Sequence, residues 1–165
     1  MRPNRLASSP EAARALTGPW IGLFPMTYAA HIAEEALCGV TFPVWVSRLW
    51  GIEFTREEFL ALNAVAFTIM CLGVLWIRLS TTGHLILAAL AFVVTFNGLA
   101  HIVASGLTWS YSPGAITGLL LWIPLGVGTL GRCRRALSRL DLNLGITIGI
   151  GLHALVSWFA FRAGS

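Results

Sequence analysis

The chain has no lysine, and only seven of its 165 residues are acidic. Charged residues make up 11% of the chain, whereas hydrophobic residues make up 56%. This composition excludes an ordinary soluble domain and predicts an all-α polytopic membrane protein. The net charge of +4 comes from eleven arginines, most of which lie between apolar runs. We therefore interpret the excess of positive charge as a determinant of membrane topology and expect no nucleic-acid partner.

Cysteine is also scarce, with three residues in the chain. Cys38, Cys71 and Cys133 lie in or beside apolar segments and show no C-x-x-C spacing. The sequence therefore indicates neither a disulfide framework nor a thiolate metal site, and we interpret the cysteines as small packing residues. Residues 1–18 are polar, and the apolar run after them lacks an A-x-A-like cleavage site, so we expect no removable signal peptide.

Long apolar runs predict five transmembrane helices in a single domain over residues 1–165. The runs cover about 20–42, 57–78, 84–106, 113–131 and 142–161. Pro43 is expected to break or kink the first run before a short interfacial helix. The pattern "TREE" from Thr55 to Glu58 predicts a capping box at the start of the second.

Arginine also predicts the orientation of the bundle. Eight arginines fall on one side of the five predicted spans and three on the other. The positive-inside rule then places residues 1–18 in the cytoplasm and the C-terminus outside. We expect an integral protein of a bacterial cytoplasmic membrane, with membrane lipid as a partner of its arginine-rich loop.

The first predicted span carries ionisable residues inside an apolar run. At 100° per residue, His31, Glu34 and Glu35 share one sector of the helix. An isolated ionised carboxylate in hydrocarbon costs several kcal/mol, so two of them must be protonated, paired or metal-bound. Because lysine is absent and the arginines lie at the borders, we expect histidines and a metal ion as their partners.

Polar residues in other predicted spans fall at a similar depth. Asn97 and His101 share a face of the third span, and His153 shares a face of the fifth with Gly145 and Gly149. A rise of 1.5 Å per residue lets these groups converge with the first span in the outer half of the membrane. Asn63 in the second span lies in the same zone. Residues 111–114 would cover this zone as a lid.

These residues predict a metal site with catalytic groups beside it. The metal-ligand candidates are His31, Glu34, Glu35, His101 and His153. The catalytic candidates are Glu34, Glu35, Asn97 and Tyr111. Imidazole and carboxylate suit zinc, iron or manganese, as one ion or two, and a glutamate that does not bind the metal would act as general acid or base. Asn97 would orient a ligand or donate to an oxyanion, and Tyr111 would gate the mouth or supply a hydroxyl. Structural hydrogen bonding is the alternative for any single buried histidine.

Three short motifs follow one another along the chain: "HIAEE" at 31–35, "NGLAH" at 97–101 and "YSPG" at 111–114. Together they resemble the HXXEE family of small integral membrane proteins, which is marked by H-x-x-E-E, N-x-x-x-H and Y-x-P-G. The resemblance implies that the motif residues matter, without implying an activity. These residues are His31, Glu34, Glu35, Asn97, His101, Tyr111, Pro113 and Gly114.

Three functions are compatible with these residues. The first is an intramembrane metal-dependent enzyme, a hydrolase or an oxidoreductase, acting on a lipid-like or hydrophobic small molecule. The second is a metal-independent isomerase or cyclase of a sterol-like or isoprenoid substrate, in which the paired glutamates share a proton. The third is a non-catalytic protein that binds a metal, a proton or a ligand. Two glycine strips, Gly114–Gly118 and Gly145–Gly149, are compatible with either internal packing or a homo-oligomer.

Overall fold

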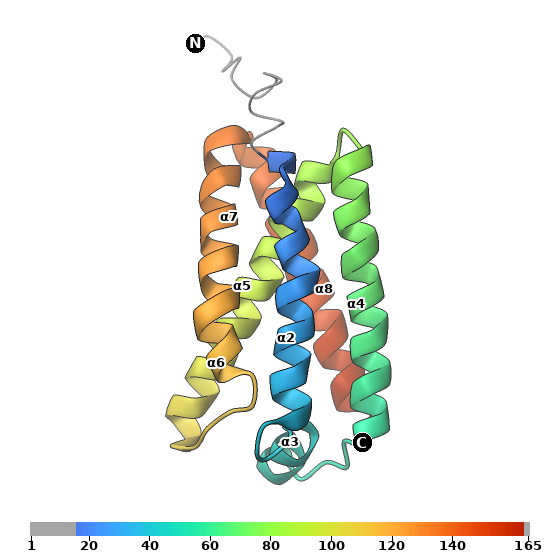
Figure 1. Ribbon diagram of the computed structural model, residues 1–165, viewed down its shortest axis with the longest axis vertical. Helices are drawn as coiled ribbons and strands as arrows, with labels where there is room; N and C mark the ends of the chain where they lie inside the picture. The colour runs from blue at the N-terminus through green and yellow to red at the C-terminus, as the bar shows by residue number, and fades with distance from the viewer. Residues whose placement is uncertain (1–15, 164–165) are drawn as a thin grey trace.

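Helices form almost all of the described chain. The computed structural model describes residues 16–163, and no strand occurs among them. The elements in chain order are the 3₁₀ turn η2 (Pro19–Gly22), α2 (Leu23–Leu37), α3 (Phe42–Trp50), α4 (Arg56–Leu79), α5 (Gly83–Thr108), α6 (Ala115–Thr117), the π-helical η3 (Gly118–Trp122), α7 (Ile123–Ala136) and α8 (Arg139–Ala163). The long helices run roughly along one axis, with α2 between α4 and α7 and with α5 and α8 behind it (Figure 1).

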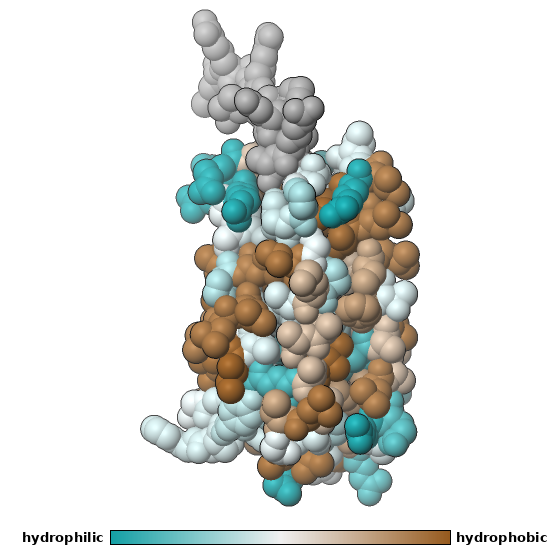
Figure 2. Space-filling model, in the orientation of Figure 1, coloured by the Kyte–Doolittle hydropathy of each residue, from teal (hydrophilic) through white to brown (hydrophobic). Residues whose placement is uncertain are grey.

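Four helices in the described part of the chain are long and apolar enough to cross a membrane. They are α4, α5, the continuous helix Ala115–Ala136 made of α6, η3 and α7, and Arg139–Arg162 of α8. Hydrophobic side chains cover most of the middle of one face of the molecule, and hydrophilic side chains gather toward its two ends (Figure 2). This distribution supports an integral membrane protein.

The prediction of five spanning helices is wrong for the first helix, which is not continuous over its predicted length. The run at about 20–42 is interrupted: α2 ends at Leu37, Gly39 takes a φ of +66°, and Thr41 is extended at the start of α3. The 15 residues of α2 are about 22 Å long, so this α-helix by itself is short of the roughly 30 Å hydrocarbon core, although the four-residue η2 leads directly into it. The break precedes Pro43, which lies in the first turn of α3, where the missing N–H is tolerated.

The later apolar runs fall on α4, α5, the helix from Ala115 to Ala136, and α8. The capping box before α4 is confirmed. Glu58 N donates to Thr55 Oγ1 at 3.2 Å, and Thr55 N donates to Glu58 Oε2 at 2.8 Å. His84 lies in the first turn of α5, where its Nδ1 is 2.9 Å from the carbonyl oxygen of Thr81.

The helix α5 forms the centre of the bundle and contacts α4, α7 and α8. Small residues allow this close packing. A Cβ atom on Gly145 would lie 2.6 Å from Ala88 Cβ, and a Cβ atom on Gly149 would lie 2.8 Å from Ala89 O. Similarly, a Cβ atom on Gly98 would lie 2.9 Å from Gly118 O. Both glycine strips therefore contribute to packing within the chain.

The contact between α5 and α7 provides a test of this packing. A Cβ atom on Gly126 would lie 2.0 Å from Thr95 Oγ1 and 2.6 Å from Ala91 O. We expect Gly126→Ala to lower the free energy of unfolding by about 1–3 kcal/mol, because the helices must move apart. Gly131→Ala in the same helix is the matched control, since nothing lies within 4 Å of its added Cβ. Unfolding by SDS in mixed micelles measures both changes, and equal stabilities of the two variants would contradict the close contact.

Candidate metal centre

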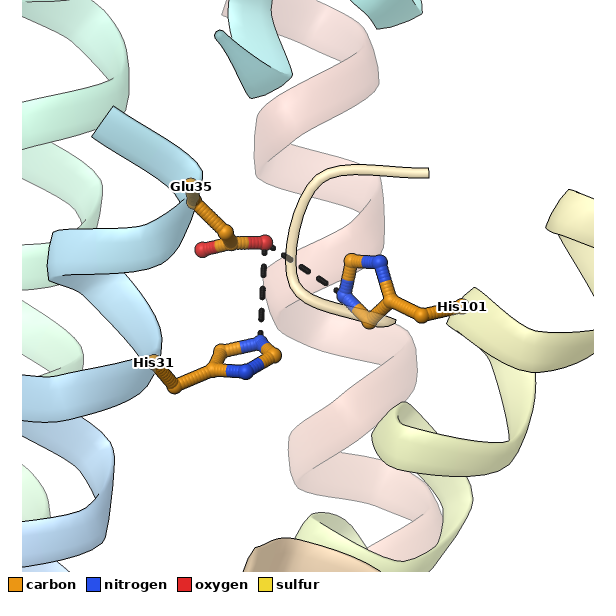
Figure 3. Close-up of side chains that lie close together, drawn as sticks. All are labelled: His31, Glu35 and His101. Carbon is orange, nitrogen blue, oxygen red and sulfur yellow. Dashed lines mark ion pairs between the residues drawn. The ribbon is translucent and has the colours of Figure 1, made fainter. Parts of the chain in front are cut away.

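Two histidines and one glutamate from two helices, α2 and α5, meet inside the bundle (Figure 3). His31 and Glu35 lie on successive turns of α2, and His101 lies on α5. Glu35 Oε1 is 3.6 Å from His31 Nε2 and 3.3 Å from His101 Nε2. The side chains are buried, and one potential ligand atom from each lies within 4.8 Å of the others. These three residues could hold a metal ion, and we call them the His–Glu–His group.

Hydroxyl groups orient both imidazole rings. His31 Nδ1 is 2.7 Å from Thr117 Oγ1, and His101 Nδ1 is 3.0 Å from Ser112 Oγ. In the tautomer with Nδ1 protonated, His31 Nδ1–H donates to Thr117 Oγ1, which itself donates to Gly114 O. This arrangement leaves the lone pair on His31 Nε2. Hydrogen bonds from the far ring nitrogen are typical of metal-binding histidines.

The Nε2 atom of His31 is a buried polar atom with no hydrogen-bond partner in the described part of the chain. Glu35 Oε1, at 3.6 Å, lies beyond hydrogen-bond range. Leaving such an atom unpaired is unfavourable, and native structures contain few examples. A metal ion bound to the His–Glu–His group would satisfy it.

Close packing fixes the planes of the two rings. His31 stacks on Trp122, with ring centroids 3.7 Å apart and an interplanar angle of 24°. Gly114 covers both imidazoles from the loop before α6 and has a φ of +97°. A Cβ atom there would lie 2.8 Å from His31 Cε1 and 2.9 Å from His101 Cε1. The glycine of "YSPG" therefore allows both the positive φ of the loop and the close approach of the loop to the two histidine rings.

The adjacent glutamate, Glu34, has different partners from those of Glu35. Its Oε1 accepts hydrogen bonds from the Tyr111 hydroxyl and from the backbone N–H groups of Gly114 (3.2 Å) and Ile116 (2.9 Å). Its Oε2 accepts from the N–H of Thr117 at 2.7 Å. A carboxylate at a helix N-terminus pairs with exposed N–H groups and with the helix dipole. Glu34 therefore joins α2 to the start of the helix that carries Thr117, and it lies outside the His–Glu–His group.

Tyr111 lies in the loop between α5 and α6, where its hydroxyl points to Glu34. Partial burial, together with the Glu34 carboxylate, raises the pKa of the Tyr111 phenol. The phenol therefore stays protonated and acts as a hydrogen-bond donor across the ordinary pH range. The structure brings Tyr111 to Glu34 and not to the His–Glu–His group.

The His–Glu–His group lines a cavity of about 330 Å³. Asn63, Asn97 and His153 line the same cavity from α4, α5 and α8. Asn63 is held by Tyr28, whose hydroxyl donates to Asn63 Oδ1 at 2.9 Å. His153 contacts the Phe96 ring edge-on with centroids 4.7 Å apart and lies outside the three-residue group. The cavity is within the size range of small-molecule sites.

Sequence reasoning missed three residues that support the site: Ser112, Thr117 and Trp122. Ser112 stands inside "YSPG", but its residue type gave no sign that it bonds His101. Thr117 and Trp122 meet His31 only because α6 and η3 pack against α2. Contacts between helices distant in sequence leave no spacing signal in a single chain.

The fold and the site together define a helical bundle of membrane-spanning character with a buried His/Glu cluster beside an apolar cavity. Residues 22–129 match the family described as "Protein of unknown function with HXXEE motif", and the chain belongs to this family. The match includes all three motifs and confirms the family expected from them. No curated protein and no solved structure matches the chain.

Proposed function

We propose that the protein is a membrane-embedded metalloenzyme that acts on a hydrophobic small molecule. His31 and His101, through Nε2, and Glu35, through its carboxylate, would bind one divalent transition-metal ion. The observation that carries this proposal is the buried, unpaired Nε2 of His31, which faces a group with the ligand types of a metal site. Three protein ligands leave a coordination position open for substrate, as catalytic sites require.

The donor set agrees with the metals expected from the sequence. Two imidazoles and a carboxylate suit zinc, and with open positions they also suit non-haem iron. A bound ion would supply Lewis-acid polarisation or water activation, and iron would add redox chemistry. The chain itself orients the ligands through Ser112 and Thr117 and surrounds the site with mostly apolar side chains. Asn97 lines the cavity and would donate to a developing oxyanion.

The two glutamates have separate roles in this proposal. Glu35 binds the ion, and Glu34 holds the loop before α6 through its hydrogen bonds to Tyr111 and the backbone. A metal-independent isomerase in which Glu34 and Glu35 share a proton gains no support, because Glu34 is already engaged by four donors. A non-catalytic metal-binding protein would use the same ligands and would differ in lacking turnover.

Metal content tests the proposal directly. Full-length protein purified without a metal-affinity tag is expected to carry about one zinc, iron or manganese ion per chain. Glu35→Gln and His101→Ala should each reduce metal retention by roughly tenfold or more, since each removes one of only three ligands. His84→Ala is the control, because His84 bonds Thr81 at the start of α5. Elemental analysis, with circular dichroism to confirm folding, measures the effect. The proposal would be overturned if the protein carried far less than one ion per chain and if Glu35→Gln and His101→Ala left this metal-to-protein ratio unchanged.

A further inference from the structure

The charge of the cavity wall is the first clue to the ligand. Aromatic and aliphatic side chains from α3, α4, α5 and α8 form most of the wall. No arginine of the described residues lines it, and the whole chain contains no lysine. An anionic group placed there would lose its hydration without gaining a cationic side chain, and a buried unpaired charge is strongly unfavourable. Apart from an ion bound to the His–Glu–His group, the cavity therefore offers no positive charge to phosphate, sulfate or carboxylate groups, and its wall disfavours them.

Polar side chains on the wall offer hydrogen bonds in place of charge. Asn97 and His153 both line the cavity. Within residues 16–163, neither side chain has a hydrogen bond to another residue, although His153 contacts the Phe96 ring. An amide both donates and accepts, and a neutral imidazole does the same. A ligand with one hydrogen-bonding group could therefore be satisfied on an otherwise apolar wall.

The cavity also reaches the surface. Trp50 of α3 and Val156 of α8 line it and are 59% and 38% exposed. Both lie on parts of the bundle whose outer side chains are largely apolar, so a molecule dissolved in a bilayer could approach there. An aqueous route is not required for an apolar ligand.

We propose that the substrate is an uncharged lipophile with one carbonyl or hydroxyl group. Its hydrocarbon or aromatic body lies against α3, α4 and α8, and its polar group bonds to Asn97 and His153 beside the His–Glu–His group. This inference rests on the proposed function, because it takes the cavity as the substrate site. It goes beyond that function by assigning the polar group of the substrate to Asn97 and His153, on a wall whose side chains disfavour anionic head groups.

Tryptophan fluorescence provides the readout, since Trp45, Trp50 and Trp122 line the cavity. Two quenching probes share the same body and differ in head group: dibrominated octadecanamide, which is neutral, and dibrominated octadecyl sulfate, which is anionic. Each is titrated into full-length protein in non-ionic micelles, as purified and after treatment with EDTA. Ala104→Phe fills the cavity, and Val103→Phe is the matched control because Val103 is 56% exposed and does not line it.

We expect saturable quenching by the amide before and after EDTA treatment. After EDTA treatment, when no ion supplies positive charge, binding of the sulfate should be weaker than that of the amide by roughly tenfold or more. Ala104→Phe should lose the saturable component and Val103→Phe should keep it. Sulfate binding as tight as amide binding in EDTA-treated protein would overturn the inference, and this comparison does not depend on how the variants fold. Equal saturable quenching in both variants would also overturn it. The metal-to-protein ratio tests the proposed function separately. If the protein bound the amide more tightly than the sulfate but carried no stoichiometric metal, the metal site would be rejected and the inference about the ligand would stand.

Discussion

Glu34→Ala is expected to lower the free energy of unfolding by about 3–5 kcal/mol. The Glu34 side chain is buried, and its carboxylate accepts hydrogen bonds from three backbone N–H groups and from the Tyr111 hydroxyl. Removing it leaves the first N–H groups of the helix that begins at Ala115 without their acceptor. The loop that carries Gly114 would then lose its attachment to α2. Unfolding by SDS in mixed micelles, followed by tryptophan fluorescence, measures the loss.

Glu35→Ala is the matched comparison, because it removes the same side chain from the next position of the same helix. The polar contacts of Glu35 are with His31 and His101, and its side chain is also buried. In EDTA-treated protein we expect its removal to change stability by less than about 1 kcal/mol, since the lost contacts are offset by the release of a buried carboxylate. Equal losses in the two variants would contradict the division of roles between the glutamates.

Apolar runs predicted most of the bundle because span length and hydropathy are local properties. The first span shows where this reasoning fails. Val40 and Phe42 keep the sequence apolar across the break, whereas the chain turns at Gly39 with a φ of +66° and restarts its helix after Thr41. Hydropathy does not report backbone conformation. The sequence therefore predicts the interruption at Pro43, but the Pro43 ring is accommodated in the first turn of α3.

Helical periodicity accounts for part of the site. His31 and Glu35 are four residues apart, so any helix places them on one face, and similar depth suggested His101 as their partner. Periodicity could not separate Glu34 from Glu35, because adjacent residues differ by only about 100° around the helix. Which of them faces α5 and which faces the start of α6 depends on the rotation of α2 in the bundle. That rotation is set by tertiary packing, including the stacking of His31 on Trp122.

Gly114→Ala is expected to lower the free energy of unfolding by about 2–5 kcal/mol and to weaken metal retention. The backbone conformation at φ +97° is unfavourable for any residue with a Cβ atom. In addition, the new Cβ would lie 2.8 Å from His31 Cε1 and 2.9 Å from His101 Cε1, so both rings must move. Displaced rings would no longer present their Nε2 atoms together. Stability in SDS and the metal-to-protein ratio are the two measurements.

Gly39→Ala separates the two causes of this loss. Gly39 also has a positive φ, +66°, but nothing lies within 4 Å of an added Cβ. Its substitution should therefore show the backbone effect alone, about 1–2 kcal/mol, with metal retention unchanged. The stability difference between the variants then measures the contact of Gly114 with the histidines. If Gly114→Ala lost no more stability than Gly39→Ala and kept its metal, the loop that carries Gly114 would not hold the histidine rings in place. Glu34, which anchors that loop, would then have no connection to the metal site.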